Sequence, residues 1–150
     1  MSAELALHAA IVEKLRADAA LGALLAPHKY KPGARAVYDY VDQSDKPEDA
    51  AEFPYIVVGD TTAAQWDADD FDGQEHTLTL HIWDRYRGSK RVREIQGAIY
   101  DALHRAALNV EGQHVVFCYY DFSGSVNDPD VPTEHAVARY RVITQALATP

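Results

Sequence analysis

The sequence contains one cysteine and one methionine, and no apolar run approaches the ~20 residues that a helix needs to cross a bilayer. The single cysteine, Cys118, excludes an internal disulfide and agrees with a reducing compartment. The first residues lack the basic segment and long apolar core of a signal peptide. We therefore expect a protein that is made in the cytoplasm and has no membrane partner.

Basic residues are also scarce, with 14 Lys and Arg against 23 Asp and Glu and a net charge of -9. Residues 39–75 hold twelve acidic side chains and one basic side chain, so this segment carries −11 and the rest of the chain +2. A protein that grips duplex DNA without regard to sequence needs Lys and Arg to release counterions from the phosphates. The charge balance argues against tight DNA binding, but it allows a surface past which DNA slides.

Catalytic motifs are missing as well. Cys118 lies in the apolar run Val-Val-Phe-Cys-Tyr-Tyr, which favours packing over nucleophilic chemistry. The seven histidines do not have zinc-site spacing; His76 and His81, five residues apart on one predicted strand, point to opposite faces. The isolated glycines form no phosphate-binding loop. We expect no enzymatic activity, no cofactor and no bound metal.

Hydrophobic periodicity predicts two main helices. Apolar residues recur at helical spacing from Ala3 to Leu21, and again at Val92, Ile95, Ile99 and Leu103 after a possible N-cap at Ser89. A chain of this length is typical of one domain, here residues 1–150.

Alternating apolar residues predict about five strands. They cover Ala36–Val41, Phe53–Gly59, the stretch from about Gln74 to Trp83, Val115–Tyr120 and His135–Ala146. Residues 42–52, 60–73 and 123–132 read as loops. Short connections favour antiparallel pairing, so we predict an α+β fold with a mostly antiparallel sheet and both main helices on one face.

A basic elbow joins the third predicted strand to the second helix. We define it by five residues: Trp83, Arg85, Arg87, Lys90 and Arg91. Such a cluster can be a solvated face balanced by nearby acids, or a contact for the acidic segment of a neighbouring copy. A ring needs two different complementary patches on each subunit, and segregated charges of opposite sign meet that need. The sequence leaves both interpretations open.

An acidic loop precedes the third predicted strand. It contains Trp66, Asp67, Asp69, Asp70 and Asp72. The spacing fails the pattern of an EF-hand, because Phe71 occupies the fifth position counted from Asp67. We interpret it as an exposed acidic surface.

Two other interpretations of the acidic residues stay open. One is a divalent-metal hydrolase built on Asp67, Asp69, Asp72 and His76. The other is an acidic mimic of DNA, although loops punctuated by proline and glycine would hold phosphate-like spacing poorly.

The order of the elements resembles the tail-completion, or tail-terminator, family of long-tailed (siphovirus-like) bacteriophages and phage-derived particles such as gene transfer agents. The resemblance spans nearly the whole chain. Its segments are Ala17–Leu21, Ala36–Asp39, Phe53–Gly59, Leu78–Trp83, Gly88–Ser89, the helix that carries Ile95, Ile99 and Leu103, Val115–Tyr120 and His135–Tyr140.

The resemblance implies a structural protein that forms a hexameric ring on the head-proximal end of the tail tube. Such a ring stops tube polymerisation, binds the head-closure (stopper) protein and lets DNA pass without specific binding. The protein would be made in the host cytoplasm and end at the head–tail junction of the particle. The basic elbow would then be a subunit or tail interface, and the acidic loop would face the DNA channel or a partner. A head-side stopper or adaptor of the same particle is the alternative.

Overall fold

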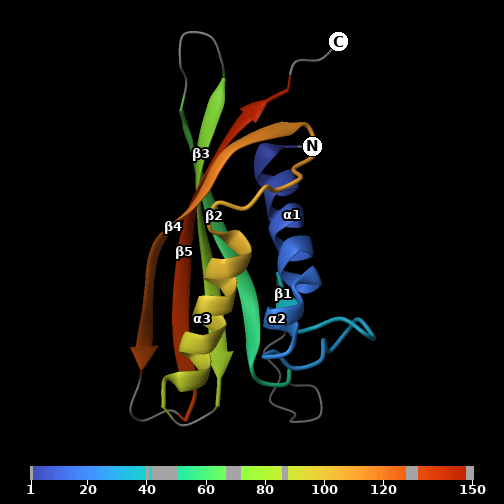
Figure 1. Ribbon diagram of the computed structural model, residues 1–150, viewed down its shortest axis with the longest axis vertical. Helices are drawn as coiled ribbons and strands as arrows, with labels where there is room; N and C mark the ends of the chain where they lie inside the picture. Colours follow the sequence, from blue (N-terminus) through green and yellow to red (C-terminus); the bar gives the residue numbers. More distant parts are fainter. Residues whose placement is uncertain are drawn as a thin grey trace.

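Five strands form one sheet in the order β1-β2-β3-β5-β4, and helices α1 and α3 lie against one of its faces (Figure 1). A computed structural model describes residues 2–39, 41, 51–66, 72–85, 88–127 and 132–147. The elements are α1 (Ala3–Ala17), α2 (Ala19–Gly22), β1 (Val37–Tyr38), β2 (Tyr55–Gln65), β3 (Gly73–Asp84), α3 (Lys90–Leu103), β4 (Gln113–Asn127) and β5 (Glu134–Ala146). Only β1 and β2 pair in parallel. The predicted α+β class is confirmed.

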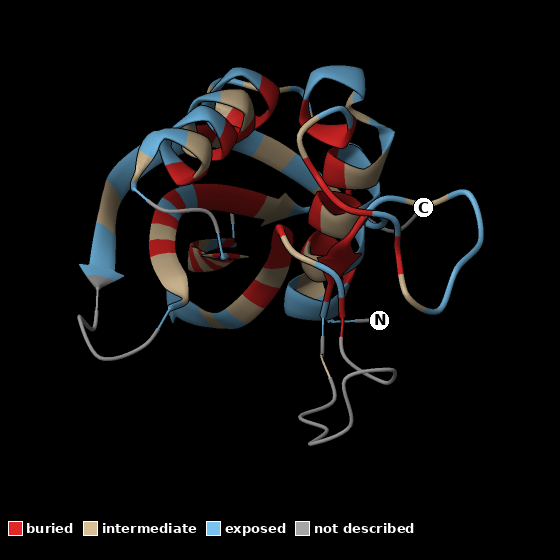
Figure 2. Cartoon of the chain, turned by 90° about the horizontal axis from the view of Figure 1, so that it is seen from below, coloured by how far each residue is buried: buried red, intermediate tan, exposed pale blue. Residues whose placement is uncertain are grey.

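The main core lies between the sheet and the helices, where the buried residues gather in Figure 2. Strand alternation sends Leu78, Leu80 and Ile82 of β3 to this side, and all three are fully buried. The α3 stripe of Val92, Ile95, Ile99 and Leu103 faces them and is also buried, as its spacing predicted. α1 packs on β1 and β2, and α3 packs on β3, β4 and β5. Within the part of the chain described, no helix is long and apolar enough to cross a membrane.

The first predicted helix is interrupted. α1 ends at Ala17 because Asp18 adopts an extended conformation and its carboxylate accepts a 2.8 Å hydrogen bond from the Leu21 N–H. Asp18 is thereby the N-cap of α2, a role that short acidic side chains favour. The prediction of one helix from Ala3 to Leu21 was wrong at this residue.

The strands also differ in length from the prediction. β2 continues to Gln65 and β4 to Asn127, so parts of two predicted loops are strand. Both extensions follow irregularities in pairing, between Val58 and Thr61 and between Tyr120 and Phe122, which let the strand bend and pair again. β1 is shorter than predicted, and the predicted loop at residues 42–50 lies outside the described residues.

A second, aromatic cluster lies on the opposite face of the sheet, near β1. Tyr38 and Tyr55 are its buried centre, with Phe53, Val57 and Trp83 packed against them. Tyr38 and Tyr55 meet edge to face with ring centroids 5.8 Å apart, a favourable aromatic geometry. This cluster anchors the end of the sheet from which the basic elbow leaves β3.

Candidate assembly surfaces

The described cations of the basic elbow have partners inside the chain. Arg91 Nε lies 3.2 Å from Asp84 Oδ2, and the Asp84 side chain is buried. The Arg85 guanidinium lies over the Phe53 ring at 4.5 Å from its centroid. Lys90 and Glu94 form an exposed pair one helical turn apart, 3.7 Å between Nζ and Oε1. The Arg91–Asp84 contact links the end of β3 to the start of α3, and two of the three described cations have acidic partners within the chain.

The remaining elbow residues are Trp83 and Arg87. Trp83 is half-buried and stacks in parallel on His135, with centroids 3.9 Å apart and planes 5° apart. Arg87 lies outside the described residues. Ser89 occupies the N-cap position of α3 but makes no capping hydrogen bond with its side chain. Trp83 therefore contributes to packing, and the Lys90 side chain is more exposed than that of Arg91.

The described residues of the acidic loop, Trp66 and Asp72, lie at the opposite end of β3 from the basic elbow. Asp67, Asp69 and Asp70 lie outside the described residues, whereas Trp66 and Asp72 are exposed on either side of them. The Trp66 N–H donates to the Gly73 carbonyl at 2.9 Å, which joins the ends of β2 and β3. The twelve residues of β3 separate the two charged surfaces by roughly 40 Å at the usual rise per residue.

A third surface was missed by the sequence analysis. β4 is the edge strand of the sheet, with β5 on one side and no described strand on the other. Large apolar side chains are exposed along it: Val116, Tyr119, Tyr120, Phe122 and Val126. Figure 2 shows this strand, at the left of the view, as largely exposed. Unpaired edges of this kind are templates for pairing with another chain. The signal in the sequence was the aromatic run continuing past Tyr120.

Groups that could carry chemistry are mostly engaged or buried. Cys118 is fully buried, and burial raises the pKa of its thiol to about 12. His76 is buried on the helix side and bonds Thr144 Oγ1 through Nε2 at 2.9 Å. Burial lowers the pKa of His76, so the ring is neutral near pH 7. Among the residues described, no three His, Cys, Asp or Glu side chains are grouped as metal ligands.

Together, the helix-covered sheet and the apolar, unpaired edge of β4 define an α+β protein with a surface suited to contact with another protein. A family model for "Tail completion protein gp17" matches residues 9–145. The chain belongs to this family, and it is therefore a structural protein of tail assembly.

The solved structures include a similar fold in the virion of a native gene transfer agent particle. The two chains superimpose with a TM-score of 0.76 at 21% identity, over 93% of this chain and 95% of that chain. No curated protein matches the sequence.

Proposed function

We propose that this protein forms a ring, with six copies as the resemblance implies, at the head-proximal end of the tail tube. The ring ends tube polymerisation and joins the tail to the head-closure protein. DNA passes through its centre without being held, in keeping with a net charge of -9. Family membership supports a tail role, and the two unlike open edges of the sheet carry the proposal of a ring.

The second open edge belongs to β2. β1 pairs only with Ile56 and Val57, so among the described strands the far half of β2 pairs with β3 alone. Small exposed residues, Ala63 and Ala64, lie on this half. Beside it is a hollow of about 680 Å³ lined in part by the exposed Leu5. Small side chains and a hollow on β2 are complementary to the large side chains on β4.

Contact between β4 of one copy and β2 of the next would be heterologous. Contacts of this type generate a closed ring when the rotation between neighbours closes, and such a ring covers the β4 edge and the far half of β2 in every copy. Apolar burial at the joint then drives association.

The test is mass measurement in solution, with and without purified tail-tube protein, followed by negative-stain imaging of tube ends. We expect rings for the wild type and loss of rings when Val116 and Val126 are both replaced by lysine. The matched control replaces exposed Ala20 and Ala107 by lysine, which adds the same charge away from the edge.

Rings that persist in the Val116→Lys, Val126→Lys variant would remove the β4 edge from the account. Absence of any ring with wild-type protein, in solution or on tubes, would overturn the proposed function. Cross-linking to the portal-side protein in place of the tube protein would instead support the head-side adaptor.

A further inference from the structure

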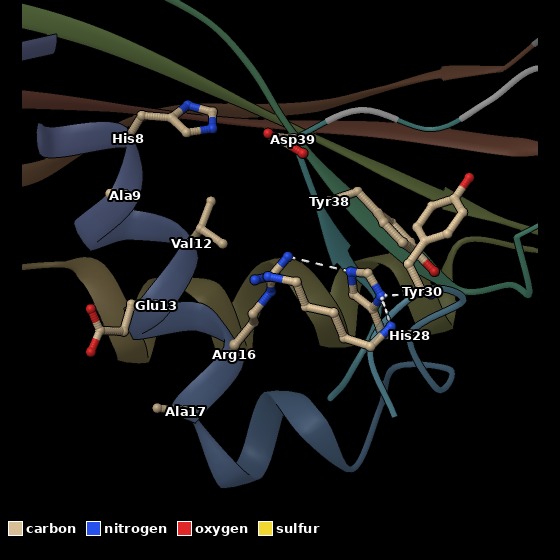
Figure 3. Close-up of a pocket in the computed structure, with 11 residues that line it drawn as sticks. His8, Ala9, Val12, Glu13, Arg16, Ala17, His28, Tyr30, Tyr38 and Asp39 are labelled. Atoms are coloured by element: carbon tan, nitrogen blue, oxygen red, sulfur yellow. Dashed lines mark hydrogen bonds between the residues drawn. The ribbon is translucent and has the colours of Figure 1, made fainter. Parts of the chain in front are cut away.

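A pocket of about 680 Å³ opens between α1 and the segment that leads into β1 (Figure 3). One side of α1 supplies His8, Val12 and Arg16, which are spaced by one helical turn. The facing segment supplies His28 and Lys31. Ala9 and Ala17 add small apolar walls. The pocket is separate from the basic elbow, the acidic loop and the β4 edge.

His28 is held in one orientation by the backbone. Its Nδ1 accepts hydrogen bonds from the N–H groups of Tyr30, at 3.0 Å, and Lys31, at 3.1 Å. Tyr38 packs on the ring, with centroids 4.3 Å apart. Burial, with help from Arg16 and Lys31, lowers the pKa of His28, so the imidazole is neutral near pH 7. A neutral imidazole has one N–H, and because Nδ1 is an acceptor the proton is on Nε2.

Arg16 reaches the same place from α1. Its Nε and Nη2 both donate to the Val37 carbonyl oxygen, at 3.2 and 2.9 Å. Nη2 also lies 3.3 Å from His28 Nε2. Since a guanidinium cannot accept a hydrogen bond and Nε2 carries its proton, these two nitrogens are both donors. Figure 3 shows the two side chains meeting at the wall of the pocket.

The local donors outnumber the acceptors. The Val37 carbonyl also interacts with the His28 imidazole and raises its pKa, but burial lowers that pKa by more. Three N–H groups, from Arg16 Nε, Arg16 Nη2 and His28 Nε2, therefore converge on one oxygen that has two lone pairs. A second acceptor oxygen at the pocket wall would satisfy the excess donor.

We propose that this pocket binds the carboxylate of an acidic side chain from a partner protein of the tail. One carboxylate oxygen would accept from both Arg16 and His28, and such charge-assisted bonds are about twice as strong as neutral ones. The short apolar walls fit the methylene groups of Asp or Glu. Glu13 and Asp39 line the same pocket, and their carboxylates repel a doubly charged phosphate more strongly than a singly charged carboxylate. The identity of the partner as a tail protein rests on the proposed function; the carboxylate chemistry does not.

The first test is the tautomer of His28, read from long-range ¹H–¹⁵N spectra of the labelled protein near pH 7. We expect the Nε2–H tautomer. A neutral ring protonated on Nδ1 would overturn the proposal, because Nε2 would then accept from Arg16 and the donor excess would be absent. This measurement does not require ring assembly, so it separates failure of the pocket from failure of the proposed function.

The second test titrates the wild-type protein with N-acetyl-glutamate α-amide, which presents one carboxylate on a peptide-like side chain. We expect saturable shifts of the His28 and Arg16 signals and no such shifts with the matched glutamine compound. Equal shifts with the glutamine compound, or stronger binding of inorganic phosphate, would overturn the proposal. So would the absence of shifts beyond those produced by sodium chloride.

Variants then assign the site. Arg16→Gln should weaken binding of the glutamate compound at least about tenfold, the loss expected for a charged hydrogen bond. Lys14→Gln removes an exposed cation from the same helix, outside the pocket, and should bind as the wild type does. Because Arg16 also supports the Val37 carbonyl, Lys31→Gln provides a milder variant, for which a smaller loss is expected. Unchanged affinity in both Arg16→Gln and Lys31→Gln would contradict the assignment.

Discussion

His81 and His135 face each other across β3 and β5, with Nδ1 of His81 2.9 Å from Nε2 of His135. One hydrogen lies between them, so one ring donates and the other accepts. Trp83 covers His135, and Gly59 gives the His81 ring room, because a Cβ at that position would lie 2.9 Å from it. Burial lowers the pKa of both histidines, and His81 lowers that of His135 further. The two rings are neutral and pack together on the face of the sheet opposite α1 and α3.

This pair predicts that acid weakens the fold. Histidines in the unfolded chain bind protons near pH ~6.5, whereas His81 and His135 bind them only at lower pH when folded. Above about pH 6.5 both states are unprotonated at these histidines and the fold keeps its full stability. As the pH falls below this value, protons bind to the unfolded chain first and the free energy of unfolding declines. His28 and His76 act in the same direction. Urea unfolding at a series of pH values should show a declining free energy of unfolding, with at most about 1.4 kcal/mol per pH unit from each group.

The control isolates the pair from the other histidines. The double variant His81→Gln, His135→Gln should have a shallower pH dependence than the wild type. His114→Gln changes an exposed histidine and should leave the slope as it is. Identical slopes for the double variant and the wild type would assign the acid sensitivity elsewhere.

Two glycines predict opposite effects of the same substitution. In Gly59→Ala the new methyl group would meet the His81 ring at 2.9 Å and the Thr79 carbonyl at 3.0 Å, and we expect a loss of about 1–3 kcal/mol. Gly97 lies inside α3, and no atom would be within 4 Å of a Cβ there. Gly97→Ala should raise stability by about 0.5–1 kcal/mol, the helix propensity difference. Chemical denaturation of both variants gives the two signs; a neutral Gly59→Ala would show that the strand shifts freely.

Much of the fold was predictable from local patterns. α3 and β3 each bury one face against the core. Their apolar residues therefore recur with the period of a helix and of a strand, and the sequence shows both periods. The break at Asp18 depends on one side-chain hydrogen bond, which hydrophobic spacing does not report. β4 was predicted too short because Gly124 and Asn127 are typical of turns, yet pairing with β5 holds both in a strand. The Arg16 and His28 pocket depends on tertiary contact between separate segments, and no periodicity reveals it.

The ion pair between Arg91 and Asp84 should contribute more to stability than an ordinary surface pair, because the Asp84 side chain is buried. Arg91→Gln leaves the buried Asp84 carboxylate with the Arg85 N–H, 2.8 Å away, but without its cation. We expect a loss of about 1–3 kcal/mol, below the usual cost for a fully buried pair because Arg91 is 38% exposed. Lys90→Gln breaks an exposed pair and should change stability by less than about 0.5 kcal/mol.

A rescue variant checks the mechanism of this loss. Adding Asp84→Asn to Arg91→Gln removes the unpaired buried charge and should restore part of the stability. If the double variant is no more stable than Arg91→Gln, the loss arises from packing and not from charge. A charge reversal at Arg91 should perturb the fold, so the exposed Lys90 is a better position for testing the basic elbow as an interface.

Cys118 provides a native probe of opening, because it is the single thiol in the sequence. Its side chain is fully buried and the pKa of its thiol is raised to about 12, so at pH ~8 roughly one molecule in 10⁴ carries the reactive thiolate. We expect a thiol reagent such as DTNB to react at a rate set by unfolding, and to react faster as urea is added. Leu103→Ala, which removes a fully buried side chain and should cost about 2–5 kcal/mol, must accelerate labelling strongly. A rate that is insensitive to both urea and Leu103→Ala would mean that the thiol is reached through local opening of β4, the edge strand that carries it.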